Sequence, residues 1–258
     1  MTMTVSIQPF EQFIERAAAP EQSLVVVNRT EPDAIRRMMG NLMSNQSVTV
    51  SDLELPGDEE DVVALVEDGE RIASSPLSAL EETILFVNSD IYTTGTQGLE
   101  DLSVPDVIRE LDEVPFELRG YPESLKEKFL LITISRYIER LAWQSSGGVL
   151  RSSFQRLSRI EDERGTREVY ETLEAAEPDV HVYGIPNWMP GADSELIVHG
   201  GYGPAFKRTW FVVFCPDEQE ETHSALVAIE RENRQWRGFW TFRSGLVSEI
   251  NRHIERRL

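Results

Sequence analysis

Five apolar, strand-like segments follow one another between residues 179 and 242, and they constrain the fold more than any other feature of the sequence. Gly, Pro or acidic turns separate them. The segments are DVHVYGIP, SELIVHG, RTWFVVFCP, HSALVAIE and QWRGFWTF. Short apolar runs bounded by such residues are typical of strands. Because consecutive strands with short links usually pair antiparallel, we expect an antiparallel sheet over these residues.

An amphipathic segment before these strands predicts a long central helix over residues 124–145. Ser124 and Glu127 have the spacing of a capping box, and Gly147 with Gly148 ends the pattern. The apolar side chains, Ile134 and Ile138 among them, cover a wide arc of this helix. We therefore expect the helix to pack on the sheet rather than lie in solvent.

The same reasoning predicts the remaining elements. Helices are expected over residues 10–17, 30–42, 166–177 and 243–258, and strands over residues 23–29, 47–55 and 61–68. A helix between the first two strands indicates a parallel crossover, and EDGER at 67–71 predicts a hairpin turn. The predicted fold class is α+β, with mixed to antiparallel sheets, packed helices and a closing C-terminal helix.

Acidic residues are concentrated in the first half of the chain. Residues 1–120 carry 24 acidic and 7 basic residues, whereas residues 121–258 carry 21 and 18. A boundary near Gly120 would separate an acidic N-terminal α/β half, residues 1–120, from a second half, residues 121–258. One continuous domain is the alternative.

The overall charge of the chain indicates in which environment the protein works and which partners it disfavours. The net charge is -20, and there are 22 arginines but only three lysines. Such a surface repels phosphate backbones, which makes nucleic acid an unfavoured partner, and it is typical of proteins that work in molar salt. We expect a halophilic protein; an ordinary acidic protein is the alternative. No long apolar run and no basic, apolar leader is present, so we expect a soluble cytoplasmic protein without membrane association.

No motif in the sequence supports catalysis, a metal or a cofactor. The four histidines are scattered without ligand spacing, and a single cysteine, Cys215, excludes a disulfide framework. Glycine-rich nucleotide loops and a G-x-S-x-G nucleophile elbow are also absent. The sequence therefore predicts no catalytic residue, no metal site and no cofactor.

Aromatic residues gathered on the predicted strands suggest a ligand site. They are either ordinary core or the wall of a small-ligand cavity between the sheet and the long helix. The candidate wall consists of Arg136, Glu139, Phe154, Gln155, Tyr183, Trp210 and Trp240. Because Arg136 and Glu139 are three residues apart on one helical face, a simple pairing of these two charges is the alternative.

Several segments, in this order and spacing, resemble a known family. They are SLKEKFLLITISRYIERLAW, GGVLRSSFQRLSRIEDERGTREVYETL, DVHVYG, TWFVVF and SALVAIERENRQWRGFWTF, preceded by TEPDAIRRMM and SPLSALEETILFVNSDIYTTGT. Together they resemble the DICT sensory domain family, in the full-length form found in halophilic archaea, over about residues 23–258. The resemblance implies a non-enzymatic signalling input module, elsewhere attached to diguanylate cyclases and two-component proteins, with a light-related role. Only one helix follows Thr241, so we expect a stand-alone module that signals by contact or through a separate effector.

Three functions are compatible with these features. The leading hypothesis is a sensory or regulatory module that binds a small ligand or a signalling protein. A DNA-associated transcriptional regulator would use the locally basic patch of Arg151, Arg156 and Arg159. An enzyme is favoured only by abundant carboxylates, and the acidic run near residue 161 is typical of a solvated face.

Overall fold

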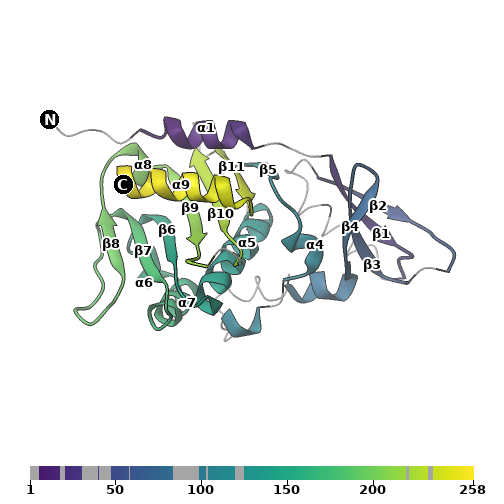
Figure 1. Cartoon of the computed structure of the whole chain (residues 1–258), viewed down its shortest axis with the longest axis horizontal. Helices are drawn as coiled ribbons and strands as arrows, with labels where there is room; N and C mark the ends of the chain where they lie inside the picture. Colours follow the sequence, from purple (N-terminus) through teal and green to yellow (C-terminus); the bar gives the residue numbers. More distant parts are fainter. Residues whose placement is uncertain are drawn as a thin grey trace.

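The computed structural model describes residues 6–17, 21–30, 40, 48–57, 59–83, 99–102, 104–119, 125–218, 221–231 and 235–258. Within these residues the fold is α+β, as predicted, with a smaller and a larger sheet beside each other (Figure 1). The C-terminal helix predicted from the sequence is present as α9 (Ser244–Arg257).

The smaller sheet has the strand order β2-β1-β3-β4. Its strands are β1 (Gln22–Val27), β2 (Val48–Leu53), β3 (Val62–Glu67) and β4 (Glu70–Pro76). The first pair is parallel, as predicted, and β3 and β4 form the predicted hairpin. Asp68 and Gly69 both have positive φ at its turn, the backbone that a tight hairpin turn needs. The helix expected over residues 30–42 lies almost wholly outside the described residues.

The larger sheet has the strand order β5-β11-β10-β9-β6-β7-β8. Its strands are β5 (Pro115–Arg119), β6 (Val149–Arg156), β7 (Asp179–Ile185), β8 (Ile197–Gly200), β9 (Thr209–Cys215), β10 (Ser224–Glu230) and β11 (Gln235–Thr241). From β5 to β6 the neighbouring strands pair antiparallel, whereas β6, β7 and β8 run parallel.

The expectation of a wholly antiparallel sheet is wrong for β7 and β8. The connection of residues 186–196 is long enough to return the chain to the end of the sheet at which β7 begins. Strand β8 therefore runs in the same direction as β7. Neither β5 nor β6 was predicted from the sequence. The latter strand lies inside the sheet, between β9 and β7.

Helices cover both faces of the larger sheet (Figure 1). On one face, here called the α5 face, lie α5 (Leu125–Gln144), α6 (Arg159–Asp162) and α7 (Arg164–Glu174). On the other, the α9 face, lie α1 (Gln8–Arg16), α8 (Pro204–Lys207) and α9. The long helix therefore packs on the sheet as predicted, with Ile134 and Ile138 fully buried. Its predicted cap at Ser124 lies outside the described residues.

Strand alternation assigns each side chain of the larger sheet to one of two cores. On β9, Val212 and Phe214 belong to the apolar cluster of the α5 face, and Phe211 and Val213 to that of the α9 face. The α5-face cluster continues into the smaller sheet, where it includes Leu65. Of the short elements, η1 (Leu99–Asp101) contacts α5, and α4 (Asp106–Arg109) contacts β3 and β4 of the smaller sheet.

The change in charge near residue 120 does not mark where the larger sheet begins. β5 belongs to the first 120 residues and pairs with β11, while α1 packs against β10 and β11. Among the helices in the described part of the chain, none combines the length and apolarity needed to cross a membrane.

Candidate functional site

The seven residues expected to line one cavity do not lie on one side of the sheet. Arg136 and Glu139 lie on α5, and Phe154, Trp210 and Trp240 belong to the same α5-face core or pack against it. Tyr183 belongs to the core of the α9 face. On β7 it is Val182 that points toward α5, so Tyr183 must point away, and a wall that includes Tyr183 is wrong.

Arg136 and Glu139 form a buried ion pair. One turn apart on α5, their Nη1 and Oε2 atoms are 2.7 Å apart, and the two side chains are only 9% and 3% exposed. The pairing that the sequence left as an alternative is therefore present.

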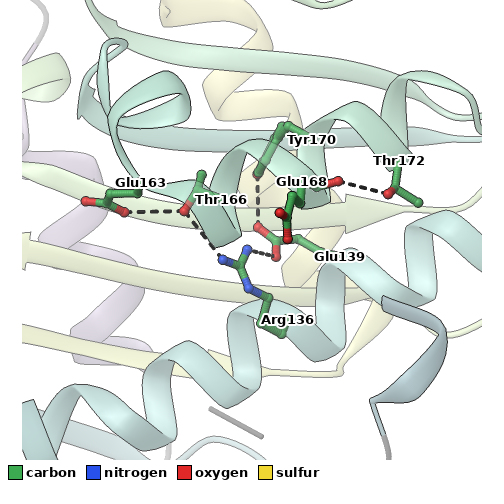
Figure 2. A network of polar contacts seen from close by, with 7 residues as sticks. All are labelled: Arg136, Glu139, Glu163, Thr166, Glu168, Tyr170 and Thr172. Atoms are coloured by element: carbon green, nitrogen blue, oxygen red, sulfur yellow. Dashed lines mark hydrogen bonds and ion pairs between the residues drawn. The ribbon is translucent and has the colours of Figure 1, made fainter. Parts of the chain in front are cut away.

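Helix α7 supplies two further members of this network (Figure 2). Thr166 and Tyr170 are four residues apart and so face α5 together. The Tyr170 hydroxyl donates to Glu139 Oε1 at 3.1 Å, and Arg136 Nη2 donates to Thr166 Oγ1 at 3.4 Å. These four residues, Arg136, Glu139, Thr166 and Tyr170, are called the α5–α7 network below.

An aromatic ring covers one side of the α5–α7 network, and a polar contact connects its other side to the surface. Phe154 packs edge-on against the Tyr170 ring, with centroids 5.1 Å apart. Thr166 also donates to Glu163 Oε2 at 3.3 Å, and the Glu163 side chain is 58% exposed. A chain of polar contacts thus runs from an exposed carboxylate through Thr166 to the buried pair.

Burial fixes the protonation state of the tyrosine in this network. Desolvation, and next the nearby Glu139 carboxylate, raise the pKa of Tyr170 well above its usual value. The phenol therefore keeps its proton and acts as a hydrogen-bond donor to Glu139.

The remaining predicted residues on this side have other surroundings. Trp240 is fully buried, stacks on Phe116 with centroids 6.1 Å apart, and donates its indole N–H to the Leu111 carbonyl at 2.6 Å. Trp210 is half-buried against the same core. Gln155 has a positive φ of 58° where the pairing of β6 with β7 is irregular. The structure thus brings Arg136, Glu139 and Phe154 together around Tyr170 and gives Trp240 a place in the core.

A second polar cluster, missed by the sequence analysis, lies on the α9 face. Arg151 lies opposite His181 in the pairing of β6 with β7, and Tyr183 lies opposite His199 in the pairing of β7 with β8. Arg151 Nη1 donates to the Tyr183 hydroxyl at 2.7 Å, and His181 Nδ1 and His199 Nε2 are 2.9 Å apart. The His199 ring stacks on Tyr183 with centroids 4.3 Å apart. These four residues, Arg151, His181, Tyr183 and His199, are called the His–Arg cluster.

The alternation of His181 and Tyr183 on one strand was the only signal of this cluster in the sequence. Both lie on the same face of β7 because they are two residues apart. Spacing alone did not show that β8 runs parallel beside β7, which is what brings His199 to them.

Both histidines of the cluster are held in the neutral form. Burial, then the charge of Arg151, then His199 lower the pKa of His181 to about 4. Burial and then Arg151 also lower the pKa of His199. Desolvation is the main cause that raises the pKa of Tyr183. At neutral pH the imidazoles are therefore uncharged hydrogen-bonding groups.

The basic patch considered for DNA binding does not form on the surface. Arg151 is 4% exposed and its Nε donates to Asn251 Oδ1 at 2.6 Å, whereas Arg156 and Arg159 are exposed. The predicted three-arginine patch is therefore wrong, because one of its members, Arg151, is buried inside the protein.

Metal binding and thiol reactivity are two further kinds of chemistry that the described residues bear on. Within them, no group of three or more His, Cys, Asp or Glu side chains is arranged to hold a metal ion. Burial raises the pKa of the Cys215 thiol to about 11, so it remains protonated at neutral pH.

Comparisons with protein-family models, with curated proteins and with solved structures give no match. The resemblance to the DICT family stays a prediction from the sequence.

Proposed function

We propose that this chain is a soluble sensory or regulatory module of the cytoplasm, without catalytic activity, and that the α5–α7 network is its responsive element. The observation that carries the proposal is the buried ion pair of Arg136 and Glu139, connected through Thr166 to the exposed Glu163. The input is a small ligand or a protein partner.

The energetics of buried charge support a role beyond stability. Removing two charges from water costs about as much as their attraction returns, so apolar residues of similar volume would stabilise the α5–α7 contact as well or better. A buried pair with a polar connection to the surface can instead have two arrangements. In one, Thr166 bridges Arg136 and Glu163, and in the other a ligand or partner takes over one of these contacts.

The state of the polar groups argues against acid–base catalysis at this network. A general acid or base must reach the substrate and exchange a proton near neutral pH. Glu139 is 3% exposed and is engaged by Arg136 and Tyr170, and the raised pKa of Tyr170 keeps its proton in place. This arrangement suits a contact that is made or broken rather than one that turns over substrate.

The resemblance to the DICT family points in the same direction. It supplies the sensory role, the halophilic archaeal setting and the suggestion of a light-related stimulus. A DNA-associated role has no comparable support, because Arg151 is buried.

The test begins with what the protein carries when purified from its own host in molar KCl. We expect a bound small molecule, seen by absorbance and by mass spectrometry of the denatured extract, or a stoichiometric protein partner. Thr166→Val cuts the bridge between Arg136 and Glu163 and should lose this cargo.

Thr172→Val is the matched control, because Thr172 lies on the same helix and its hydroxyl donates only to the Glu168 carbonyl, at 2.8 Å (Figure 2). Both variants should melt close to the wild type by circular dichroism. The proposal is wrong if the wild type carries neither ligand nor partner, if the two variants carry cargo equally, or if the purified protein converts the bound molecule to a product.

A further inference from the structure

The charge of Arg151 is poorly neutralised for a buried guanidinium. Its Nε and Nη1 donate to Asn251 Oδ1 and the Tyr183 hydroxyl, which are both neutral oxygens. Within the described part of the chain its Nη2 makes no hydrogen bond, and the carboxylate it approaches is Glu255 Oε1 at 4.0 Å, on a side chain that is 60% exposed. Since a buried cation is costly unless an anion compensates it, this face holds unused positive charge.

The two histidines of the cluster add directed hydrogen-bond donors beside this charge. The hydrogen bond between His181 Nδ1 and His199 Nε2 uses one N–H, whichever ring supplies it. In either tautomer, one of the two outer nitrogens, His181 Nε2 or His199 Nδ1, carries an N–H and the other a lone pair. The neutral pair therefore offers one outward donor, and protonation adds a second.

We propose that Arg151, His181 and His199 form a binding site for an oxyanion, the phosphate or carboxylate group of a small ligand. Three adjacent strands, β6, β7 and β8, hold these residues on one face, and both imidazoles are half-buried and so accessible from solvent. The site lies on the face of the sheet opposite the α5–α7 network, so it does not rest on the proposed sensory role.

Other charged and titratable groups lie around the histidines, and an incoming anion must compete with the negatively charged ones among them. Asp179, at the start of β7, raises the pKa of His181 slightly against the lowering causes, and Glu255 of α9 approaches Arg151. The Cys215 thiol of β9 is uncharged at neutral pH. An incoming oxyanion replaces the weak contact with Glu255 and offsets the charge of Arg151.

Anion binding must then be linked to proton uptake. The free site keeps the pKa of both histidines low, and a bound anion raises it, because the negative charge favours the imidazolium. Affinity should therefore increase as the pH falls from about 7 to about 5, by at most about tenfold per pH unit for each proton taken up.

The experiment is calorimetric titration of the full chain with sulfate, inorganic phosphate and acetate, in a fixed molar concentration of KCl, at about pH 5 and about pH 7. Sulfate keeps its charge over this range, so any pH dependence with sulfate belongs to the protein. We expect at least one of these anions to bind, with a Kd at least about fivefold lower at the lower pH. Preference for phosphate or for acetate distinguishes a phosphorylated from a carboxylated ligand.

Two variants decide whether the cluster is responsible. His199→Gln keeps a hydrogen-bonding group beside His181 but cannot take up a proton, so it should weaken binding and remove most of the pH dependence. His223→Gln, in the segment just before β10, should bind as the wild type does. Arg151→Met should abolish binding, and if it does not fold, His199→Gln still carries the test. Absence of binding by all three anions, binding that is independent of pH, or unchanged binding by His199→Gln would overturn the proposal.

Discussion

Two arginines are buried on opposite faces of the same sheet, and they differ in how their charge is compensated. Arg136 is 7% exposed and lies 2.7 Å from the buried carboxylate of Glu139. Arg151 is 4% exposed, yet its hydrogen bonds go to a phenol and an amide, and Glu255 is 4.0 Å away. The first cation is part of a closed internal contact, whereas the second leaves a positive field near two accessible imidazoles. Burial of a charge therefore has different consequences on the two faces.

The largest effect should come from breaking the closed pair. Glu139→Ala removes the carboxylate that compensates Arg136 and takes the acceptor from Tyr170, so we expect the free energy of unfolding to fall by about 3–5 kcal/mol. Denaturant unfolding in fixed KCl measures this change. The double variant Arg136→Met with Glu139→Leu should recover the whole loss, and a loss below about 1 kcal/mol for Glu139→Ala would show that the pair is not buried as described.

An apolar residue of the same helix provides the reference for this cost. Ile138 is fully buried between α5 and the sheet. Ile138→Ala should lower the free energy of unfolding by about 2–5 kcal/mol through lost burial and the cavity left behind. The loss in Glu139→Ala depends on Arg136, whereas the loss in Ile138→Ala should not. In a variant that combines Ile138→Ala with a substitution at Arg136, the two losses of stability should therefore add. A neutral effect of Ile138→Ala would place α5 at the periphery.

The α5 face was the more predictable of the two, because periodicity determines a helix and alternation a strand. The 3.6-residue repeat of apolar side chains located α5 and the side that it buries, and the spacing of Arg136 and Glu139 showed that they could pair. Tyr170 and Thr166 could not be assigned to this pair from the sequence, since the contact depends on how α7 is placed across α5.

Predicting the α9 face required β6, whose sequence does not show that it is an inner strand of the sheet. At its centre Arg151, Ser152 and Ser153 are polar but buried, and such a run does not read as an inner strand. Two of these side chains find partners far along the chain: Ser153 donates to the Thr209 carbonyl at 3.1 Å, and Arg151 donates to Asn251. Pattern reasoning treats a polar residue as exposed, so it fails where distant elements satisfy it.

Removing the second buried cation should cost less than breaking the first pair. Arg151→Met leaves the Tyr183 hydroxyl and the Asn251 amide without a donor, but it leaves no buried charge uncompensated. We expect a loss of about 1–3 kcal/mol in the same unfolding experiment. If Arg151→Met destabilised the protein more than Glu139→Ala, the contrast between the two faces would be reversed.

The histidines should make only the α9 face sensitive to mild acid. Their pKa values are lower in the folded than in the unfolded protein, so below about pH 6.5 the unfolded chain binds more protons and the free energy of unfolding falls until about pH 4. Because both rings are half-buried, solvent screening keeps this change modest. The double variant His181→Gln with His199→Gln should unfold with a weaker pH dependence over this interval. A wild-type profile that is flat there, or that rises toward acid, would contradict the lowered pKa values.

The smallest effect is expected where the same chemistry lies on the surface. Arg164 and Glu168 on the outside of α7 are 2.7 Å apart, the same distance as in the buried pair, but their side chains are 50% and 40% exposed. Water solvates both charges, and the arginine lies on the N-terminal side of the glutamate, the less favourable order for a helical pair. Arg164→Ala should therefore lower the free energy of unfolding by only about 0.3–0.5 kcal/mol at low ionic strength.

Molar KCl should remove the difference in stability between Arg164→Ala and the wild type, because the screening length is then about 3 Å. Glu139→Ala should lose nearly as much stability in molar salt as in dilute buffer, since salt does not enter the core. Equal salt dependence of the two variants would mean that solvent, rather than burial, governs both pairs.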